Sequence, residues 1–175
     1  VVSGNCSLYN ETNGKGIPPT PAIGGVGLIP DVSLTADIKL KREGDLLVLI
    51  GREQGHLGQS LYQLIETGKS EGAPPPVDLD DEIKAGNLVR ALIREKKVDT
   101  VHDASDGGLL VAVAEMALAG GIGVELHPYE GKLPAHAFWF GEDQGRYIVA
   151  AAPSRAEEIA ERARLLGLSV RIVGR

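Results

Sequence analysis

The fold is decided by the residues Leu46-Leu47-Val48-Leu49-Ile50, a continuous apolar run that Gly51 closes. A run of this length is typical of a β-strand covered on both faces, because both of its side-chain rows are apolar. Further strands are predicted at residues 98–102, 123–127, 137–140, 147–152 and 168–173. The run therefore indicates the centre of a sheet with other elements packed on each side.

Helices are predicted between these strands at residues 55–67, 78–97, 109–119 and 154–166. Apolar residues at helical spacing define the faces that the first two should bury. These faces are Leu57, Leu61, Leu64 and Ile65 in the first helix, and Ile83, Leu88, Leu92 and Ile93 in the second. The third is rich in Ala, Leu and Val, so we expect it to be buried.

Capping residues support two of these helices. Asp78, Asp80 or Asp81 can cap the second, and Ser154 with Glu157 forms a capping box for the last. The resulting order, β-α-α-β-α-β-β-α-β, is not a regular parallel alternation. We therefore predict an α+β (α/β layered) domain, with a mixed β-sheet packed with helices.

The first thirty-one residues differ from the rest. Asn13-Gly14 is a strong turn signal, and three prolines at positions 18, 19 and 21 exclude a helix there. Residues 22–29 are expected to form a strand. This stretch is too short for a core of its own, so residues 1–31 are interpreted as the tail of a preceding domain and 44–175 as a second domain. The missing initiator Met and the abrupt end at Arg175 suggest a piece of a longer chain.

Composition limits the function classes. The net charge of -6 argues against a general nucleic-acid binder, which would carry a basic patch. The single cysteine, Cys6, allows no intrachain disulfide, which agrees with a cytoplasmic location. One Cys and four scattered His argue against a zinc site. No apolar run approaches the ~18–20 residues of a membrane span. The sequence thus predicts a protein with neither nucleic acid nor membrane as a partner.

Three segments carry candidate chemistry. In Ser3-Gly4-Asn5-Cys6-Ser7, Gly4 allows close backbone approach, Asn5 offers an oxygen to Mg²⁺ and Ser7 a hydroxyl, although an ordinary turn is the more common explanation. The run 102–108 places a glycine pair at the start of a helix. It predicts either a site for a Mg²⁺-bridged phosphate or a simple helix cap, and the residues favour neither. The polar run 141–146 could hold a substrate or be a charged loop.

Together these segments resemble a known family. Val2-Ser3-Gly4-Asn5-Cys6-Ser7-Leu8-Tyr9-Asn10-Glu11, the run from Pro19 to Gly27 and the run from His102 to Leu109 are similar, in order and spacing, to the second half of the large subunit of phosphoribosylformylglycinamidine synthase (synthase II). This family resembles two fused copies of aminoimidazole ribonucleotide synthetase. The resemblance implies a synthetase C-terminal-type domain preceded by a remnant of the nucleotide-binding domain.

The resemblance also implies an activity. The family is an ATP-dependent C–N ligase of purine biosynthesis, which converts formylglycinamide ribonucleotide and glutamine-derived ammonia into formylglycinamidine ribonucleotide. ATP and Mg²⁺ are the implied cofactors, and a glutaminase subunit and a small accessory subunit the implied partners. The catalytic histidine belongs to a region that this sequence lacks, so we expect the chain to be inactive alone.

By the same resemblance, Gly4 is expected to contact ATP, Asn5 and Asp103 to bind Mg²⁺, and Ser7 to contact the substrate. Cys6 stands where the family usually has Val. Glu142, Asp143 and Gln144 are similar to a substrate loop of the first copy; in the second copy such sites serve either an auxiliary nucleotide or no ligand.

Two other interpretations stay open. One is a related ATP-dependent enzyme of the same superfamily, such as aminoimidazole ribonucleotide synthetase, selenophosphate synthetase or thiamine-phosphate kinase. The run from Ser3 to Glu11 argues against all three. The other is a non-catalytic structural or partner-binding domain, which Mg-ATP binding would distinguish.

Overall fold

The structure is a computed structural model that describes residues 2–5 and 10–175. The chain divides into two compact units, Val1–Pro30 and Asp31–Arg175, and each is described by itself. The domain assignment made from the sequence, 1–31 and 44–175, remains a prediction. Among the described residues, no helix is long and apolar enough to cross a membrane.

The first unit contains a small hairpin. Strands β1 (Glu11–Thr12) and β2 (Lys15–Gly16) pair antiparallel. The turn between them places Asn13 at φ 54° and Gly14 at φ 74°. Two consecutive positive φ angles are what a two-residue hairpin turn requires, so the predicted Asn-Gly turn is confirmed.

The prediction of a strand at residues 22–29 is wrong. These residues have no regular secondary structure, and Ile23, Val26 and Leu28 are each more than 90% exposed. Among the described residues of this unit, the segment has no partner strand to satisfy its backbone groups. Its glycines at 24, 25 and 27 also weaken any strand preference, because glycine contributes no side chain to pack.

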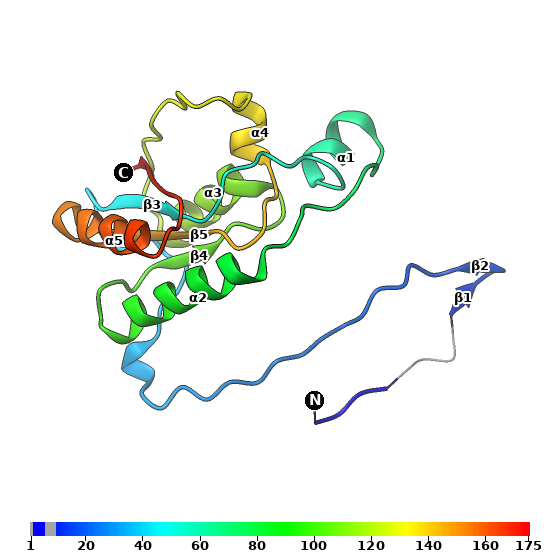
Figure 1. The fold of residues 1–175 in the computed structure, drawn as a ribbon, viewed down its shortest axis with the longest axis horizontal. Helices are drawn as coiled ribbons and strands as arrows, with labels where there is room; N and C mark the ends of the chain where they lie inside the picture. The colour runs from blue at the N-terminus through cyan, green and yellow to red at the C-terminus, as the bar shows by residue number, and fades with distance from the viewer. Residues whose placement is uncertain (1, 6–9) are drawn as a thin grey trace. The chain divides into compact units, whose positions relative to one another are not determined.

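The second unit is built around a four-stranded sheet (Figure 1). Its strands are β3 (Leu46–Ile50), β4 (Val101–Asp103), β5 (Tyr147–Ala151) and β6 (Val170–Gly174), in the order β4-β5-β3-β6. Every pairing of these strands is antiparallel. The parallel component among the described residues is an isolated bridge between Asp37 and Thr100, close to the short 3-10 helix η1 (Val32–Leu34).

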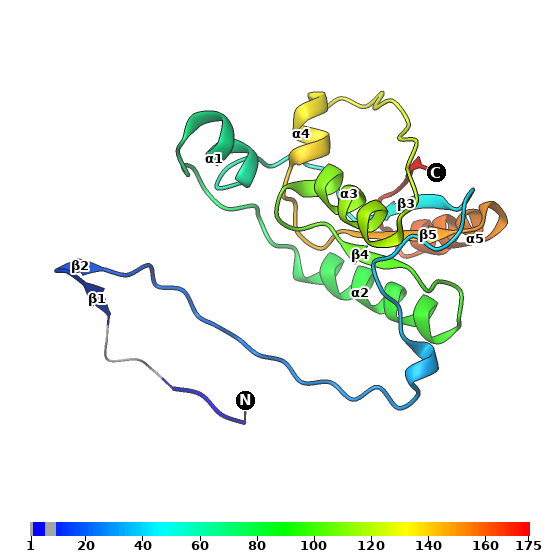
Figure 2. The same ribbon diagram turned by 180° about the vertical axis from the view of Figure 1, so that it is seen from behind.

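Helices cover both faces of this sheet, as Figures 1 and 2 show from opposite sides. They are α2 (Leu79–Arg94), α3 (Gly108–Gly120), α4 (Ala135–Phe140) and α5 (Pro153–Leu165). Helix α1 (Leu61–Thr67) lies apart from the sheet in both views. Val48 and Ile50 of β3 pack in a core with α2 and α5. Leu47 and Leu49 pack in a second core with α3 and α4. The predicted layered fold, with β3 covered on both faces, is confirmed.

Several element predictions need correction. Residues 137–140 lie in α4 rather than in a strand, because Pro134 starts a helix that directs Phe138 into the second core. The segment 123–127 contributes only the bridge between Leu126 and Gly174. Helix α5 begins at Pro153 with Ala152 as N-cap, so the Ser154 capping box does not form.

The faces of the first two helices also differ from prediction. Helix α1 starts at Leu61 rather than at residue 55, and its Leu64 and Ile65 are 44% and 78% exposed. In α2, Ile83 is exposed while Leu88 and Leu92 are buried as predicted. The Asp78 side chain accepts a hydrogen bond from the Asp81 N–H, which confirms Asp78 among the three cap candidates.

Candidate functional site

The loop before β5 forms the centre of the candidate site, and Asp143 is its most enclosed carboxylate. Its Oδ2 accepts hydrogen bonds from the backbone N–H groups of Gln54 and Gly55, each at 2.9 Å, and its Oδ1 accepts one from His56 at 3.0 Å. Asp143 is only 5% exposed. Three backbone donors therefore satisfy this buried charge and hold residues 54–56 in place.

Arg146 is the buried counter-charge to Asp143. Its guanidinium lies 3.7 Å from the Asp143 carboxylate and donates to the carbonyl oxygens of Gly141 and Asp143. Burial lowers the pKa of the Arg146 guanidinium, while the negative charge of Asp143 opposes that shift. The loop is thus closed on itself by a buried ion pair.

Glu142 contacts a different set of backbone groups. Its Oε1 accepts hydrogen bonds from the backbone N–H groups of Leu61 and Gly107, both at 2.8 Å. The first donor starts α1 and the second is the N-cap residue of α3. The carboxylates of Glu142 and Asp143 are therefore engaged by backbone groups of this chain, and only Gln144 of the three is exposed.

The turn from β4 into α3 depends on two glycines in the left-handed region. Gly107 has φ 78° and Gly108 φ 72°. Helix α3 has no side-chain cap, so neither Ser105 nor Asp106 caps it. A Cβ on Gly108 would lie 2.6 Å from the Gly141 carbonyl oxygen. This close approach brings the 141–146 loop against the start of α3.

Asp103 ends β4 at the rim of this turn, with a side chain that is 65% exposed. It accepts a hydrogen bond from the Ser105 hydroxyl at 3.0 Å and lies 3.3 Å from the His102 Nδ1. Partial burial alone would raise the pKa of Asp103, but the hydrogen bonds from Ser105, the backbone and His102 outweigh it, so the pKa lies below its usual value. Asp103 is thus ionised and open to solvent at neutral pH.

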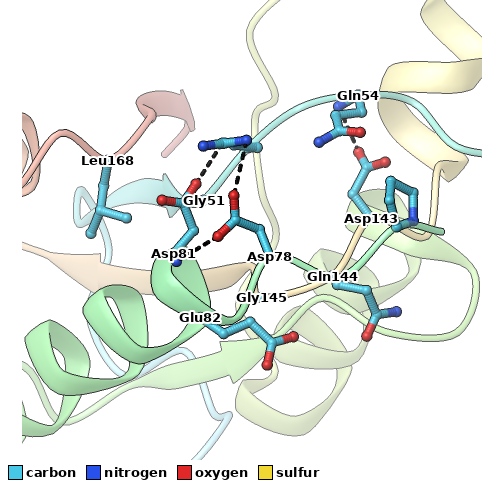
Figure 3. A pocket seen from close by; sticks show the side chains of 11 residues that line it. Gly51, Gln54, Asp78, Asp81, Glu82, Asp143, Gln144, Gly145 and Leu168 are labelled. Atoms are coloured by element: carbon cyan, nitrogen blue, oxygen red, sulfur yellow. Dashed lines mark hydrogen bonds and ion pairs between the residues drawn. The ribbon is translucent and has the colours of Figure 1, made fainter.

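A pocket adjoins this loop (Figure 3). Arg52 pairs there with Asp78 at 3.3 Å and with Asp81 at 2.5 Å. Figure 3 marks contacts of the Asp78 and Asp81 carboxylates with dashed lines. The lining residues are Gly51, Arg52, Gln54, Pro76, Asp78, Asp81, Glu82, Asp143, Gln144, Gly145 and Leu168. Its polar wall is more acidic than basic, which does not suit a bare phosphate.

The predicted site residues fall in different parts of the chain. Gly4 and Asn5 lie in the first unit and are exposed, whereas Ser7, like Cys6, lies outside the described residues. Asp103 lies in the second unit beside His102 and Ser105. Over residues 2–5 and 10–175, no group of three or more His, Cys, Asp or Glu side chains is arranged to hold a metal ion.

Glu115 is a residue that the sequence interpretation missed. It lies on α3 and its Oε2 is 2.7 Å from the His102 Nε2. Its signal in the sequence was that it is the sole charged residue between positions 107 and 124. A lone charge in an apolar helix is costly to bury, so a partner or exposure should have been expected for it.

The fold and this turn define a domain of the aminoimidazole ribonucleotide (AIR) synthetase type. Residues 42–175 match the family described as AIR synthase related protein, C-terminal domain, and the chain belongs to this family. Its relatives point to one enzyme in particular. The chain is 56% identical over 174 residues to the phosphoribosylformylglycinamidine synthase subunit PurL of Methylocella silvestris, and the match covers 99% of this chain and 24% of that protein.

A second relative is similar. The PurL subunit of Nitrobacter hamburgensis is 59% identical over 149 residues, which is 85% of this chain and 20% of that protein. The chain thus spans about a quarter of the length of the curated relatives it matches. The resemblance stated from the sequence motifs is confirmed.

Solved structures agree on the fold. Thermotoga maritima PurL complexed with FGAR superposes with a TM-score of 0.68 at 22% identity, over 82% of this chain and 25% of that one. The E. coli hydrogenase maturation protein HypE gives a TM-score of 0.52 at 22% identity, over 75% of this chain and 43% of that one. These likenesses show that the fold is shared beyond a single enzyme.

Proposed function

We propose that the chain forms part of an ATP-dependent C–N ligase of purine biosynthesis. This ligase joins glutamine-derived ammonia to formylglycinamide ribonucleotide and produces formylglycinamidine ribonucleotide, ADP and phosphate. The observation that carries the proposal is the 56% identity to a PurL subunit over 99% of the chain. In this proposal the chain supplies a synthetase C-terminal-type domain and acts in the cytoplasm with the rest of the polypeptide.

ATP and Mg²⁺ are the proposed cofactors. Thermotoga maritima PurL has been solved in complex with ATP, with ADP and with AMPPCP, which supports a nucleotide ligand. Mg²⁺ takes oxygen ligands and is usually held by one or two carboxylates together with phosphates and waters. The ionised, exposed carboxylate of Asp103 fits that donor set. Mg²⁺ would supply charge neutralisation for the phosphates of the nucleotide.

The remaining site residues keep their proposed roles. Gly4 contacts ATP, Asn5 binds Mg²⁺ and Ser7 contacts formylglycinamide ribonucleotide. The proposed protein partners are a glutaminase subunit and a small accessory subunit. The solved structure of PurLQS from Thermotoga maritima supports an assembly of this kind.

Within the second unit, the chain's own residues have a supporting task in this proposal. Glu142 and Asp143 hold the backbone at Gly107 and at residues 54–56. The contact of Glu142 with Gly107 holds the turn that follows Asp103. Since none of the described residues is assigned a catalytic role, the 175-residue chain should bind ligands without completing the reaction.

The test is an assay of the encoded full-length protein. ADP release should depend on both formylglycinamide ribonucleotide and ammonium, and the 175-residue chain alone should release none. A folded full-length protein that shows no turnover dependent on the ribonucleotide would overturn the proposed ligase.

A second candidate is a non-catalytic structural or partner-binding domain. It is favoured by the engagement of Glu142 and Asp143 with backbone donors. Titration calorimetry of the chain with Mg-ATP separates the two candidates, because a purely structural domain should give no heat of binding.

A further inference from the structure

A second cavity lies in the second unit, where the loop after α2 meets the start of α5. Its volume is about 290 Å³. Four segments contribute to its wall: the short helix η1, the approach to β3, the loop after α2 and the junction of β5 with α5. Its lining residues differ from those of the pocket beside the 141–146 loop.

The charged residues of this cavity are mostly basic. Arg42, Lys96, Lys97 and Arg155 line it together with a single carboxylate, that of Asp99, which gives a formal excess of three positive charges. The whole chain, in contrast, has a net charge of -6. A concave wall of one charge sign raises the local concentration of ions of the opposite sign. The cavity therefore favours an anion.

Two of the four cations already have carboxylate partners. Arg42 donates to Asp99 with hydrogen bonds of 2.9 and 3.0 Å and to Asp45 at 3.0 Å. Lys97 pairs with Glu158 at 2.9 Å. Because Arg42 neutralises Asp99, that carboxylate repels an incoming anion only weakly. The uncompensated positive charge belongs to the other two cations.

Lys96 and Arg155 have no carboxylate within ion-pair distance in the part of the chain that the structure describes, residues 2–5 and 10–175. Arg155 Nη1 donates to the carbonyl oxygens of Lys97 and Lys96 at 3.3 and 3.4 Å. These contacts hold the guanidinium against the loop after α2 and leave its Nε and Nη2 donors for a ligand. Helix α5 starts beside them without a side-chain cap, so the positive end of its dipole adds to the field.

Apolar side chains form the rest of the wall. Leu34, Ile93, Val98 and Ala151 line the cavity next to the cations. A volume of about 290 Å³ is at the lower end of the range for small-molecule pockets, roughly 300–1,000 Å³. The cavity is therefore too small for a dinucleotide, and a bare inorganic anion would leave its apolar wall uncovered.

We propose that this cavity binds a small phosphomonoester of about the size of a pentose phosphate. A phosphomonoester carries a charge of about −1.5 to −2 at pH 7, which matches the two uncompensated cations. Arg155 suits a two-pronged contact with phosphate oxygens, and Lys96 supplies a point charge. The apolar residues contact the attached carbon skeleton. This inference does not rest on the proposed ligase reaction.

The test follows the amide shifts of the ¹⁵N-labelled 175-residue chain during titration with ribose 5-phosphate and, separately, with inorganic phosphate. NaCl keeps the ionic strength constant, because screening alone changes the interactions of exposed charges. Ribose 5-phosphate should move the amides of residues 33–35, 96–99 and 154–156 in one saturable step. Inorganic phosphate should bind about threefold more weakly, since it buries less apolar surface.

Two substitutions remove one cation each and keep the aliphatic part of the side chain. Lys96→Met and Arg155→Met should each raise the half-saturating concentration of ribose 5-phosphate about tenfold, as expected for a lost hydrogen bond to a charged group. Lys96→Arg keeps the positive charge and should stay within about threefold. Asp99→Asn should lower the half-saturating concentration about threefold, because it frees the charge of Arg42.

Lys84→Met is the matched control. Lys84 is an exposed lysine of α2 outside the cavity, and its removal changes the net charge as much as Lys96→Met does. It should leave the titration unchanged. Thermal unfolding of each variant shows whether the domain is still folded at the temperature of the experiment. Tighter binding by Asp99→Asn cannot come from loss of structure.

Each outcome bears on the inference. Saturable shifts that are weakened in folded Lys96→Met and Arg155→Met, unchanged in Lys84→Met and strengthened in Asp99→Asn support it. Shifts spread over the surface without saturation would overturn the site, as would equal effects of Lys96→Met and Lys84→Met. Equal affinities for ribose 5-phosphate and inorganic phosphate would overturn the assignment of an ester.

Discussion

The Oε1 oxygen of Glu142 accepts a hydrogen bond from the backbone N–H of Gly107 at 2.8 Å, and this contact ties the loop before β5 to the start of α3. The same oxygen accepts the N–H of Leu61 at 2.8 Å. Gly107 and Leu61 are 46 residues apart in the chain. One carboxylate therefore holds the N-cap residue of α3 and the first residue of α1, which no local sequence signal connects.

Glu142→Ala should lower the free energy of unfolding by about 1.5–3 kcal/mol, the range for a hydrogen bond to a charged group. Glu142→Gln should lose less, because one amide oxygen remains to accept. Urea denaturation measures the loss, and amide exchange at Leu61 and Gly107 locates it. Glu66→Ala, at an exposed position of α1, serves as the control and should change stability by no more than about 0.5 kcal/mol. Equal stability of Glu142→Ala and the control would contradict this account.

Asp143→Ala should be more damaging than Glu142→Ala. It leaves the buried Arg146 without its counter-charge and three backbone N–H groups without their acceptor. Breaking a buried pair by removing one partner costs about 3–5 kcal/mol. Urea or thermal unfolding checks this value. Its neighbour Gln144 is exposed, so Gln144→Ala should stay within about 0.5 kcal/mol; a similar effect of both substitutions would rule out the ion pair as the cause.

The ion pair between Asp99 and Arg42 should make stability depend on pH. Hydrogen bonds from Arg42, at 2.9 and 3.0 Å, lower the pKa of Asp99 below its usual value, although burial opposes the shift. The folded-state pKa then lies below the unfolded value of about 3.9, so the pair stabilises fully above that pH. Its contribution disappears as the pH falls through the folded-state pKa.

Asp99→Asn should therefore lower stability at pH 7 by only about 0.5–1 kcal/mol, because both side chains are nearly half exposed and water screens the pair. The difference between Asp99→Asn and the unsubstituted chain should shrink as the pH falls below about 4. Denaturation at a series of pH values from 7 to about 2.5 tests this. A difference that stays constant over that range would exclude the ion pair as its source.

Gly108→Ala should be costly for two separate reasons. Its φ of 72° is unfavourable for alanine, and the new Cβ would meet the Gly141 carbonyl oxygen at 2.6 Å. Gly68→Ala is the matched control, since Gly68 has φ 69° and no atom within 4 Å of its Cβ position. The control should lose about 1–2 kcal/mol from backbone strain alone. Gly108→Ala should lose clearly more in thermal unfolding, and an equal loss would show that the loop moves away freely.

Sequence patterns predicted several elements because the decisive interactions are local or periodic. Both side-chain rows of β3 are apolar, and Leu47 and Val48 accordingly pack in opposite cores. Asp78 caps α2 by accepting a hydrogen bond from Asp81, three residues further on. The Asn13-Gly14 turn joins the paired residues Thr12 and Lys15, so it involves four consecutive residues. Each of these outcomes depends on residues that are neighbours in the chain.

Patterns failed where a short apolar segment suits more than one structure. Residues 137–140 have the composition of a strand, but in the folded chain Phe138 stacks on Tyr129 with ring centroids 3.9 Å apart, and the segment is helical. Leu64 and Ile65 have helical spacing, yet α1 has little of the domain to cover and leaves them exposed. The choice depended on packing partners distant in sequence.

The candidate site divides in the same way. Asp103 could be placed at a strand end before a glycine pair from its own neighbourhood. The contact of His102 with Glu115 and the hydrogen bonds from residues 54–56 to Asp143 could not be predicted in this way. These partners are 13 and 87–89 residues apart in the chain.

By itself, the sequence determined the family, the layered fold, the central strand and the turn that carries Asp103. Each of these was predicted from motifs or apolar runs whose residues are neighbours in the chain. Tertiary structure alone decided that Glu142 and Asp143 hold backbone N–H groups. The reason is physical: a carboxylate can pair with a metal, a ligand or a backbone donor equally well. Only folding determines which of these partners lies within hydrogen-bond distance.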